Sequence, residues 1–194
     1  MEKTRHHKAA KNRTTAFCRK LRETLEATAG EGFEWIEGGR IHDFGHRTPQ
    51  RPAHDRQAVD VVGKPKRGGP TILIEVELRR RACVKNVIKV WRWADDGEFP
   101  SRFVLIQAFS KYYAKDAEGH PDRVIAEFVG KKMQKAIGST CGYLAQDFSY
   151  RPTEHGKLGA GARTRRAVQL GRAVARKLRT LDTGKAKARA AAAG

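Results

Sequence analysis

Three carboxylates lie among aliphatic and β-branched residues in one short stretch of the sequence. In VDVVGKPKRGGPTILIEVELRR, residues 59–80, these carboxylates are Asp60, Glu75 and Glu77. Carboxylates that crowd together raise each other's pKa, so a compensating charge is expected beside them. Mg²⁺, or Mn²⁺ in its place, suits such a site because hard cations prefer oxygen ligands. The stretch therefore predicts a metal site at these three residues that activates water and binds phosphate oxygens. Asp55 is an alternative to Asp60, although it lacks flanking apolar residues.

Strand pairing decides whether the three acids meet. The pattern predicts strands over 57–63 and 70–80. Side chains alternate between the two faces of a strand, so the two glutamates share one face. The aspartate joins them if the strands form a hairpin in which Val62 lies opposite Thr71 or Leu73, whereas a shift by one residue separates them. The alternative is that the glutamates form the solvent-exposed face of an amphipathic strand.

The hydrophobic pattern predicts an α/β domain with a mixed central sheet flanked by helices. Runs rich in Ile and Val alternate with segments in which apolar residues recur every three or four positions. The order of helix, three strands, helix, strand, helix and strand is typical of this class. The expected helices cover 14–30, 82–97, 122–137 and 158–182, and the expected strands cover 33–38, 57–63, 70–80, 102–109 and 141–150.

Positive charge is concentrated at the two ends of the chain. The formal net charge is +19, of which residues 1–20 contribute +6 and residues 151–194 contribute +10. We expect a basic N-terminal arm over 1–13, a domain over 14–150, and a basic C-terminal helix with a disordered tail over 151–194. The C-terminal helix either docks on the core or becomes ordered on a partner. Because phosphate contacts release counterions, nucleic acid is the expected partner, and an anionic membrane surface is the alternative.

The sequence indicates a protein of a reducing compartment. Cys18, Cys83 and Cys141 are isolated, which argues against zinc-ligand spacing and against a disulfide framework. No stretch approaches the ~18 apolar residues of a membrane span, and no apolar segment follows the basic N-terminus. We therefore expect a cytoplasmic protein with no membrane partner, associated with the nucleoid if its source is bacterial.

The order of elements and the acidic motif resemble the PD-(D/E)xK nuclease superfamily, which includes many restriction endonucleases. The resemblance covers roughly residues 14–110 and rests on Asp60 in VDVV and on Glu75 and Glu77 in IEVEL. It implies a restriction-endonuclease-like fold and a Mg²⁺-dependent endonuclease in restriction or phage-related defence, with DNA favoured over RNA. It also implies that Asp60 and Glu75 bind the metal, while Glu77 binds a second metal or orients water. The family usually has Lys at the position of Glu77, so a non-catalytic nucleic-acid-binding protein on a nuclease-like fold is the alternative.

Basic residues near the acids and in the C-terminal segment are the expected auxiliary groups. In some members of this family the lysine lies on the following helix, where this chain has Lys85, Lys89 and Arg92 on one face. Lys85 or Lys89 is expected to stabilise transition-state charge, the alternative being a solvated helix face. The residues expected to bind nucleic acid are Arg79, Arg80, Arg92, Arg165, Arg166, Arg172 and Arg176. If both strands of a duplex are cut, a homodimer with two sites is expected.

Overall fold

The computed structural model describes the backbone of residues 2–40, 58–78, 83–97, 102–113, 120–149 and 160–192. Its helices are α1 (Glu2–Thr28), α2 (Cys83–Asp95), α3 (Pro121–Ile137) and α4 (Ala160–Ala192). Its strands are β1 (Phe33–Arg40), β2 (Ala58–Pro65), β3 (Thr71–Glu77), β4 (Phe103–Ser110) and β5 (Cys141–Phe148). Short 3₁₀ helices, η2 (Lys111–Tyr113) and η3 (Gly138–Thr140), follow β4 and α3. The expected α/β class is confirmed.

The strands form one mixed five-stranded sheet in the order β1-β2-β3-β4-β5. β1, β2 and β3 are antiparallel neighbours, whereas β3, β4 and β5 run parallel. The parallel strands are joined through α2 and α3, since parallel pairs need a crossover connection. Val62 pairs with Leu73, which is one of the two predicted registers. By strand alternation, Asp60 therefore lies on the face of Glu75 and Glu77.

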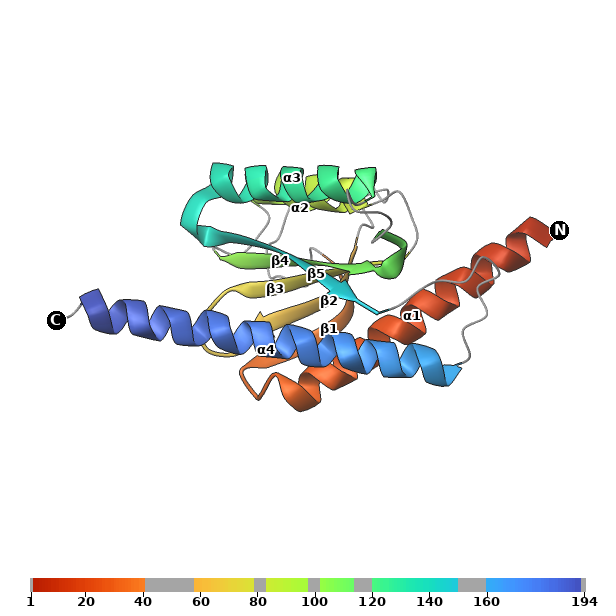
Figure 1. Ribbon diagram of the computed structural model, residues 1–194, viewed down its shortest axis with the longest axis horizontal. Coiled ribbons are helices and arrows are strands. Elements are labelled where there is room, and N and C mark those ends of the chain that lie inside the picture. The colour runs from red at the N-terminus through yellow and green to blue at the C-terminus, as the bar shows by residue number, and fades with distance from the viewer. Residues whose placement is uncertain are drawn as a thin grey trace.

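Helices cover both faces of the sheet (Figure 1). α1 and α4 pack on one face, and the core there includes Leu21, Leu25, Ile72, Ile74, Ile106, Leu170 and Val174. α2 and α3 pack on the other face, and the core there includes Leu73, Val87, Val90, Trp93, Leu105 and Met133. Because β3 and β4 are covered on both faces, all their side chains are buried, including those of Glu75 and Glu77.

α4 docks on the core, as one of the two predicted arrangements requires. Its buried face comprises Ala167, Leu170, Gly171, Val174, Ala175 and Leu178. Gly171 lets α1 approach closely, because a Cβ atom at this position would lie 2.7 Å from Cγ2 of Thr24. Nearby, Nη1 of Arg179 donates a 3.0 Å hydrogen bond to the carbonyl oxygen of Thr28, the last residue of α1. The two terminal helices therefore form one layer.

Both terminal helices are longer than predicted. α1 begins at Glu2 rather than at residue 14, and α4 continues to Ala192 rather than ending at residue 182. The added segments contain no proline and are rich in Ala, Lys and Arg, residues of high helix propensity. The two basic ends therefore have helical backbones. Within the described ranges, no helix is long and apolar enough to cross a membrane.

Candidate active site

The site begins where β2 and β3 separate. Their pairing runs from Gly63 opposite Ile72 to Val61 opposite Ile74. Beyond that point Oδ2 of Asp60 accepts a 2.8 Å hydrogen bond from the backbone N–H of Val76. A buried N–H needs an acceptor, and here a carboxylate replaces the strand carbonyl that would otherwise serve. This bond holds the Asp60 carboxylate against the edge of β3.

Glu75 of β3 is paired with Lys89 of α2. The Lys89 Nζ lies 2.6 Å from Oε1 of Glu75 and 3.0 Å from the carbonyl oxygen of Ala58. It also lies 5.3 Å from the centre of the Trp93 ring, within range of a cation–π interaction. The side chains of Lys89 and Glu75 are only 10% and 4% exposed. A contact this deeply buried is weakly screened by solvent, so the charge of Lys89 acts strongly on Glu75.

Glu77 is held by two amide side chains. Asn86 of α2 and Gln107 of β4 each donate a 2.9 Å hydrogen bond to Oε1 of Glu77. Gln107 is fully buried; it also donates to the carbonyl oxygen of Cys83 and accepts a 2.8 Å bond from the hydroxyl of Tyr143. A polar network this well satisfied is rigid, because every bond that is broken leaves a buried group unpaired. The network fixes Glu77 beside Glu75.

Glycine in α3 makes room for this network. Tyr143 of β5 places its ring against Gly130, and a Cβ atom at Gly130 would collide with the ring. The ring is thereby held on the α2–α3 side of the sheet, with its hydroxyl directed at Gln107.

Burial sets the electrostatics of the acids. Loss of solvation raises the pKa of Glu75 to about 8, although the charge of Lys89 lowers it; the charge of Asp60 raises it further. Burial also raises the pKa of Asp60 against the opposing effect of its backbone donor. It raises the pKa of Glu77 against that of the two amides. A cation bound nearby would favour the ionised carboxylates, and it would therefore lower the raised pKa values of these acids.

The carboxylate oxygens of Asp60 and Glu75 are of the kind that binds a hard cation. Among the described residues, hydrogen-bond partners engage Oδ2 of Asp60 and Oε1 of Glu75, and no partner engages the second oxygen of either. Mg²⁺ typically uses one or two carboxylates together with water and substrate phosphate. No group of three or more His, Cys, Asp or Glu side chains suited to a metal occurs in the described part of the chain. Asp60 and Glu75, each with one oxygen that has no partner among the described residues, could hold a cation, and a role of Glu77 as a third ligand stays a prediction.

Among the described residues, the other predicted site residues form no hydrogen bond with the three acids. On α2, Lys85 and Arg92 are exposed, and Nε of Arg92 lies 3.5 Å from Asp96, so of the two candidate lysines Lys89 is the one beside the acids. On α4, Arg166 donates to Gln169 at 2.8 Å. The exposed arginines predicted there are Arg165, Arg172 and Arg176. Arg79, Arg80 and Asp55 lie outside the described residues.

Gln107 and Tyr143 are site residues that sequence reasoning missed. Residues 102–109, RFVLIQAF, were expected to form a purely apolar buried strand. A glutamine within such a run was the available signal, because a buried amide needs partners on a neighbouring element. The hydroxyl of Tyr143 gave no such signal, since tyrosine is common in strands.

Comparison of the chain with protein-family models, with curated proteins and with solved structures finds no match. The function is therefore inferred from the arrangement of Asp60, Glu75, Glu77 and Lys89.

Proposed function

We propose that this protein is a metal-dependent nuclease that hydrolyses phosphodiester bonds, with Mg²⁺ or Mn²⁺ held by Asp60 and Glu75. One observation carries the proposal: the two carboxylates come together where β2 and β3 separate, with the ammonium group of Lys89 2.6 Å from Glu75. Acids and a lysine in a nearly dry site can bind a cation and stabilise phosphate charge at the same place.

Each residue of the site has a separate role in this proposal. When bound, the cation lowers the pKa of a water molecule and neutralises charge on the phosphate. Asp60 is oriented by its bond to the Val76 N–H, and Glu75 by its bond to Lys89. Lys89 can donate to a phosphate oxygen as negative charge develops there. Glu77, fixed by its two amides, would orient water in this proposal.

The fold supports the same proposal. A helix, three strands, a helix and a strand follow one another, with the acids on the second and third strands. This is the order that the resemblance to the PD-(D/E)xK superfamily rests on, and we include a restriction-endonuclease-like fold in the proposal. Duplex DNA is the proposed substrate, with the cytoplasm as the site of action and a homodimer where both strands are cut.

A second candidate is a non-catalytic nucleic-acid-binding protein. The observation that favours it is that the acids already have partners within the protein, since Lys89 bonds Glu75 and two amides bond Glu77. In this case the acids would be a buried polar network that specifies the packing of α2 on the sheet.

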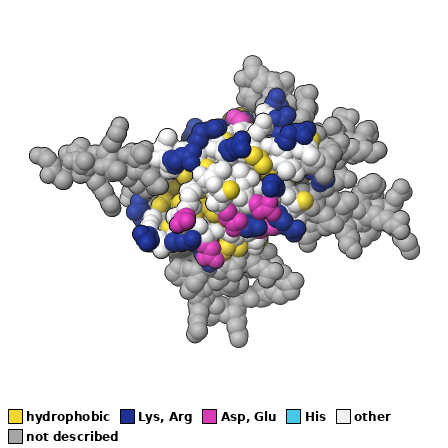
Figure 2. Space-filling view, turned by 90° about the horizontal axis from the view of Figure 1, so that it is seen from below, with side chains coloured by type: hydrophobic (Ala, Val, Ile, Leu, Met, Phe, Trp, Pro, Cys, Tyr) yellow, Lys and Arg dark blue, Asp and Glu magenta, His cyan; other side chains and the backbone are white. Residues whose placement is uncertain are grey.

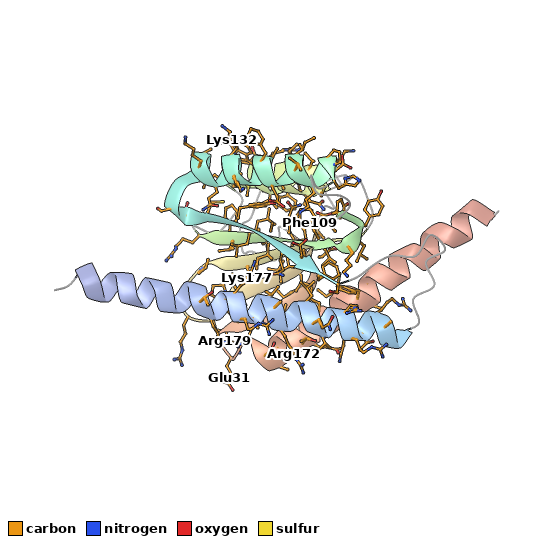
Figure 3. The ribbon with its side chains drawn as sticks, in the orientation of Figure 1. Glu31, Phe109, Lys132, Arg172, Lys177 and Arg179 are labelled. Carbon is orange, nitrogen blue, oxygen red and sulfur yellow. The ribbon has the colours of Figure 1, made fainter. Side chains whose placement is uncertain are left out.

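Plasmid nicking distinguishes the two candidates. Supercoiled DNA is incubated with the protein in Mg²⁺, in Mn²⁺ and in a chelator, and the wild type is compared with Asp60→Asn and Glu75→Gln. Glu31→Gln is the matched control, because Glu31 is exposed and lies beyond the layer of α1 and α4 (Figure 3). We expect metal-dependent nicking that falls roughly 100-fold or more in both site variants and is unchanged in the control.

A gel shift accompanies the nicking assay. Metal-independent retention of DNA without any nicking would favour the non-catalytic candidate. Nicking that survives Glu75→Gln would mean that the reaction occurs elsewhere and would remove the basis of the proposal.

A further inference from the structure

α4 carries a row of arginines on the side opposite its buried face. Its exposed positions at heptad spacing are Arg165, Gln169, Arg172, Arg176 and Arg179. We call this set the α4 stripe. At 1.5 Å per residue it extends over about 21 Å, the length of several phosphate repeats of a duplex strand. In Figure 3, Arg172 and Arg179 lie on the side of α4 away from the sheet.

Among the residues that the structure describes, no acidic side chain pairs with Arg165, Arg172 or Arg176 of the α4 stripe. Residues 161–180 contain no acidic residue. Like charges three or four residues apart destabilise a helix by roughly 0.2–0.5 kcal/mol per pair, so the row is unfavourable until an anion binds. Figure 2 shows basic side chains over much of this side of the molecule, with a smaller group of acidic ones.

The α4 stripe lies on the other side of the sheet from the acids. Glu75 and Glu77 are bonded to α2 on one face of the sheet. α4 packs on the opposite face, where Nζ of Lys177 donates a 3.2 Å hydrogen bond to the carbonyl oxygen of Ala145 in β5. Lys177 thus secures the inner side of α4, whereas Arg172 lies on the side away from the sheet (Figure 3). A phosphate at the acids and a phosphate at the α4 stripe are therefore separated by the sheet.

The composition of α4 favours nucleic acid over a membrane surface. An interfacial membrane helix inserts an apolar face, but the apolar face of α4 is already packed on the core. Among the described residues, the exposed large apolar side chains are instead on α2 and α3, and they are Ile88, Val124, Ile125 and Phe128. Arginine binds phosphate oxygens with two parallel hydrogen bonds, and each such contact releases counterions from a duplex. A linear row of arginines matches a linear row of phosphates.

We propose that the α4 stripe is a second nucleic-acid-binding surface, separate from the acids, that anchors the phosphate backbone of a duplex. Its role in cleavage rests on the proposed nuclease function, whereas its binding of DNA does not. The surface sets affinity, and it raises the local concentration of DNA near the site without contacting the bond that is broken.

The test compares two variants that each lose three positive charges. One variant changes Arg165, Arg172 and Arg176 to Gln, and the control changes Lys131, Lys132 and Lys135, exposed on α3, to Gln. Arg179 is left intact because it bonds α1, and glutamine preserves helix propensity. Binding of a fluorescent DNA duplex is measured at several salt concentrations in a chelator, and circular dichroism checks the helix content.

We expect the α4 variant to bind the duplex at least about 10-fold more weakly near physiological salt. The slope of log affinity against log salt should fall by about 2.5, close to one unit for each lost phosphate contact. The α3 control should change the slope by less than about 1. At saturating DNA with Mg²⁺, the single-turnover cleavage rate of the α4 variant should equal that of the wild type.

Three results would overturn the proposal that the α4 stripe anchors DNA. The first is a salt slope that the α4 variant does not change, or changes no more than the α3 control. The second is loss of binding to phosphatidylserine vesicles while duplex binding is retained, which would identify a membrane surface. The third is a lower cleavage rate at saturating DNA, which would place the stripe in the reaction. If the wild type does not cleave, the proposed function fails, but the binding comparison still tests the α4 stripe.

Discussion

Glu75→Gln should stabilise the metal-free protein. The increase in the free energy of unfolding over the wild type should become larger as the pH rises. Burial raises the pKa of Glu75 from 4.5 to about 8. The folded state therefore keeps a proton that the unfolded state has lost over this range. The stability contributed by this proton is fully present below pH 4.5 and is lost as the pH rises through about 8. Glutamine resembles the protonated acid in shape and charge, so it avoids this loss.

The size of the gain follows from the two pKa values. Each unit between them corresponds to ~1.4 kcal/mol. Relative to its stability below pH 4.5, the wild type therefore loses about 1 kcal/mol at pH 5, about 3 kcal/mol at pH 7, and at most about 5 kcal/mol once the pH exceeds the folded-state pKa. Glu75 is almost completely buried, with 3% of its surface exposed, so solvent screening removes little of this difference. Glu75→Gln should become more stable than the wild type by these amounts.

Urea denaturation in a chelator at several pH values between 5 and 9 measures the difference in the free energy of unfolding between Glu75→Gln and the wild type. Tryptophan fluorescence reports unfolding, since Trp35 and Trp93 are buried. Glu31→Gln, exposed, should stay within about 0.5 kcal/mol of the wild type at each pH. Mg²⁺ should stabilise the wild type more at higher pH, because it binds the ionised acid, and should have little effect on Glu75→Gln. A variant less stable than the wild type, or a gap that does not widen with pH, would show that the Lys89 pair keeps Glu75 ionised and would refute the reasoning.

Two further substitutions test the packing around the acids. Lys89→Met should destabilise the fold by about 2–4 kcal/mol, because it leaves the buried oxygens of Glu75 and Ala58 without their donor, and it should also reduce nicking. Lys85→Met, exposed on the same helix, should change the free energy of unfolding by less than about 0.5 kcal/mol; equal effects of the two substitutions in urea would contradict the placement of Lys89. Gly130→Ala should cost about 1–3 kcal/mol, since the added methyl group collides with the Tyr143 ring, although helix propensity alone predicts a gain of about 1 kcal/mol. Thermal unfolding of Gly130→Ala with a raised midpoint would show that the ring moves aside without cost.

The sequence by itself determined the class of the fold and the identity of the acids. Alternating and helical periods depend on local geometry, so they placed every described strand and the central part of every described α-helix. The face shared by Glu75 and Glu77 followed from strand alternation alone. Helix ends were the weak point: α1 and α4 continue through basic, alanine-rich segments that carry no stop signal.

Tertiary structure decided the register, the lysine and the partners of the acids. Val62 opposite Leu73 selects one of two registers, because side-chain packing on both faces of the sheet favours one pairing that turn length leaves open. Lys85 and Lys89 are equivalent on a helical projection, and only the packing of α2 on the sheet turns Lys89 toward Glu75. Gln107 reaches Glu77 across 30 positions of the chain through parallel pairing of β3 and β4. Sequence spacing cannot specify such contacts, because they arise from long-range packing rather than from local periodicity.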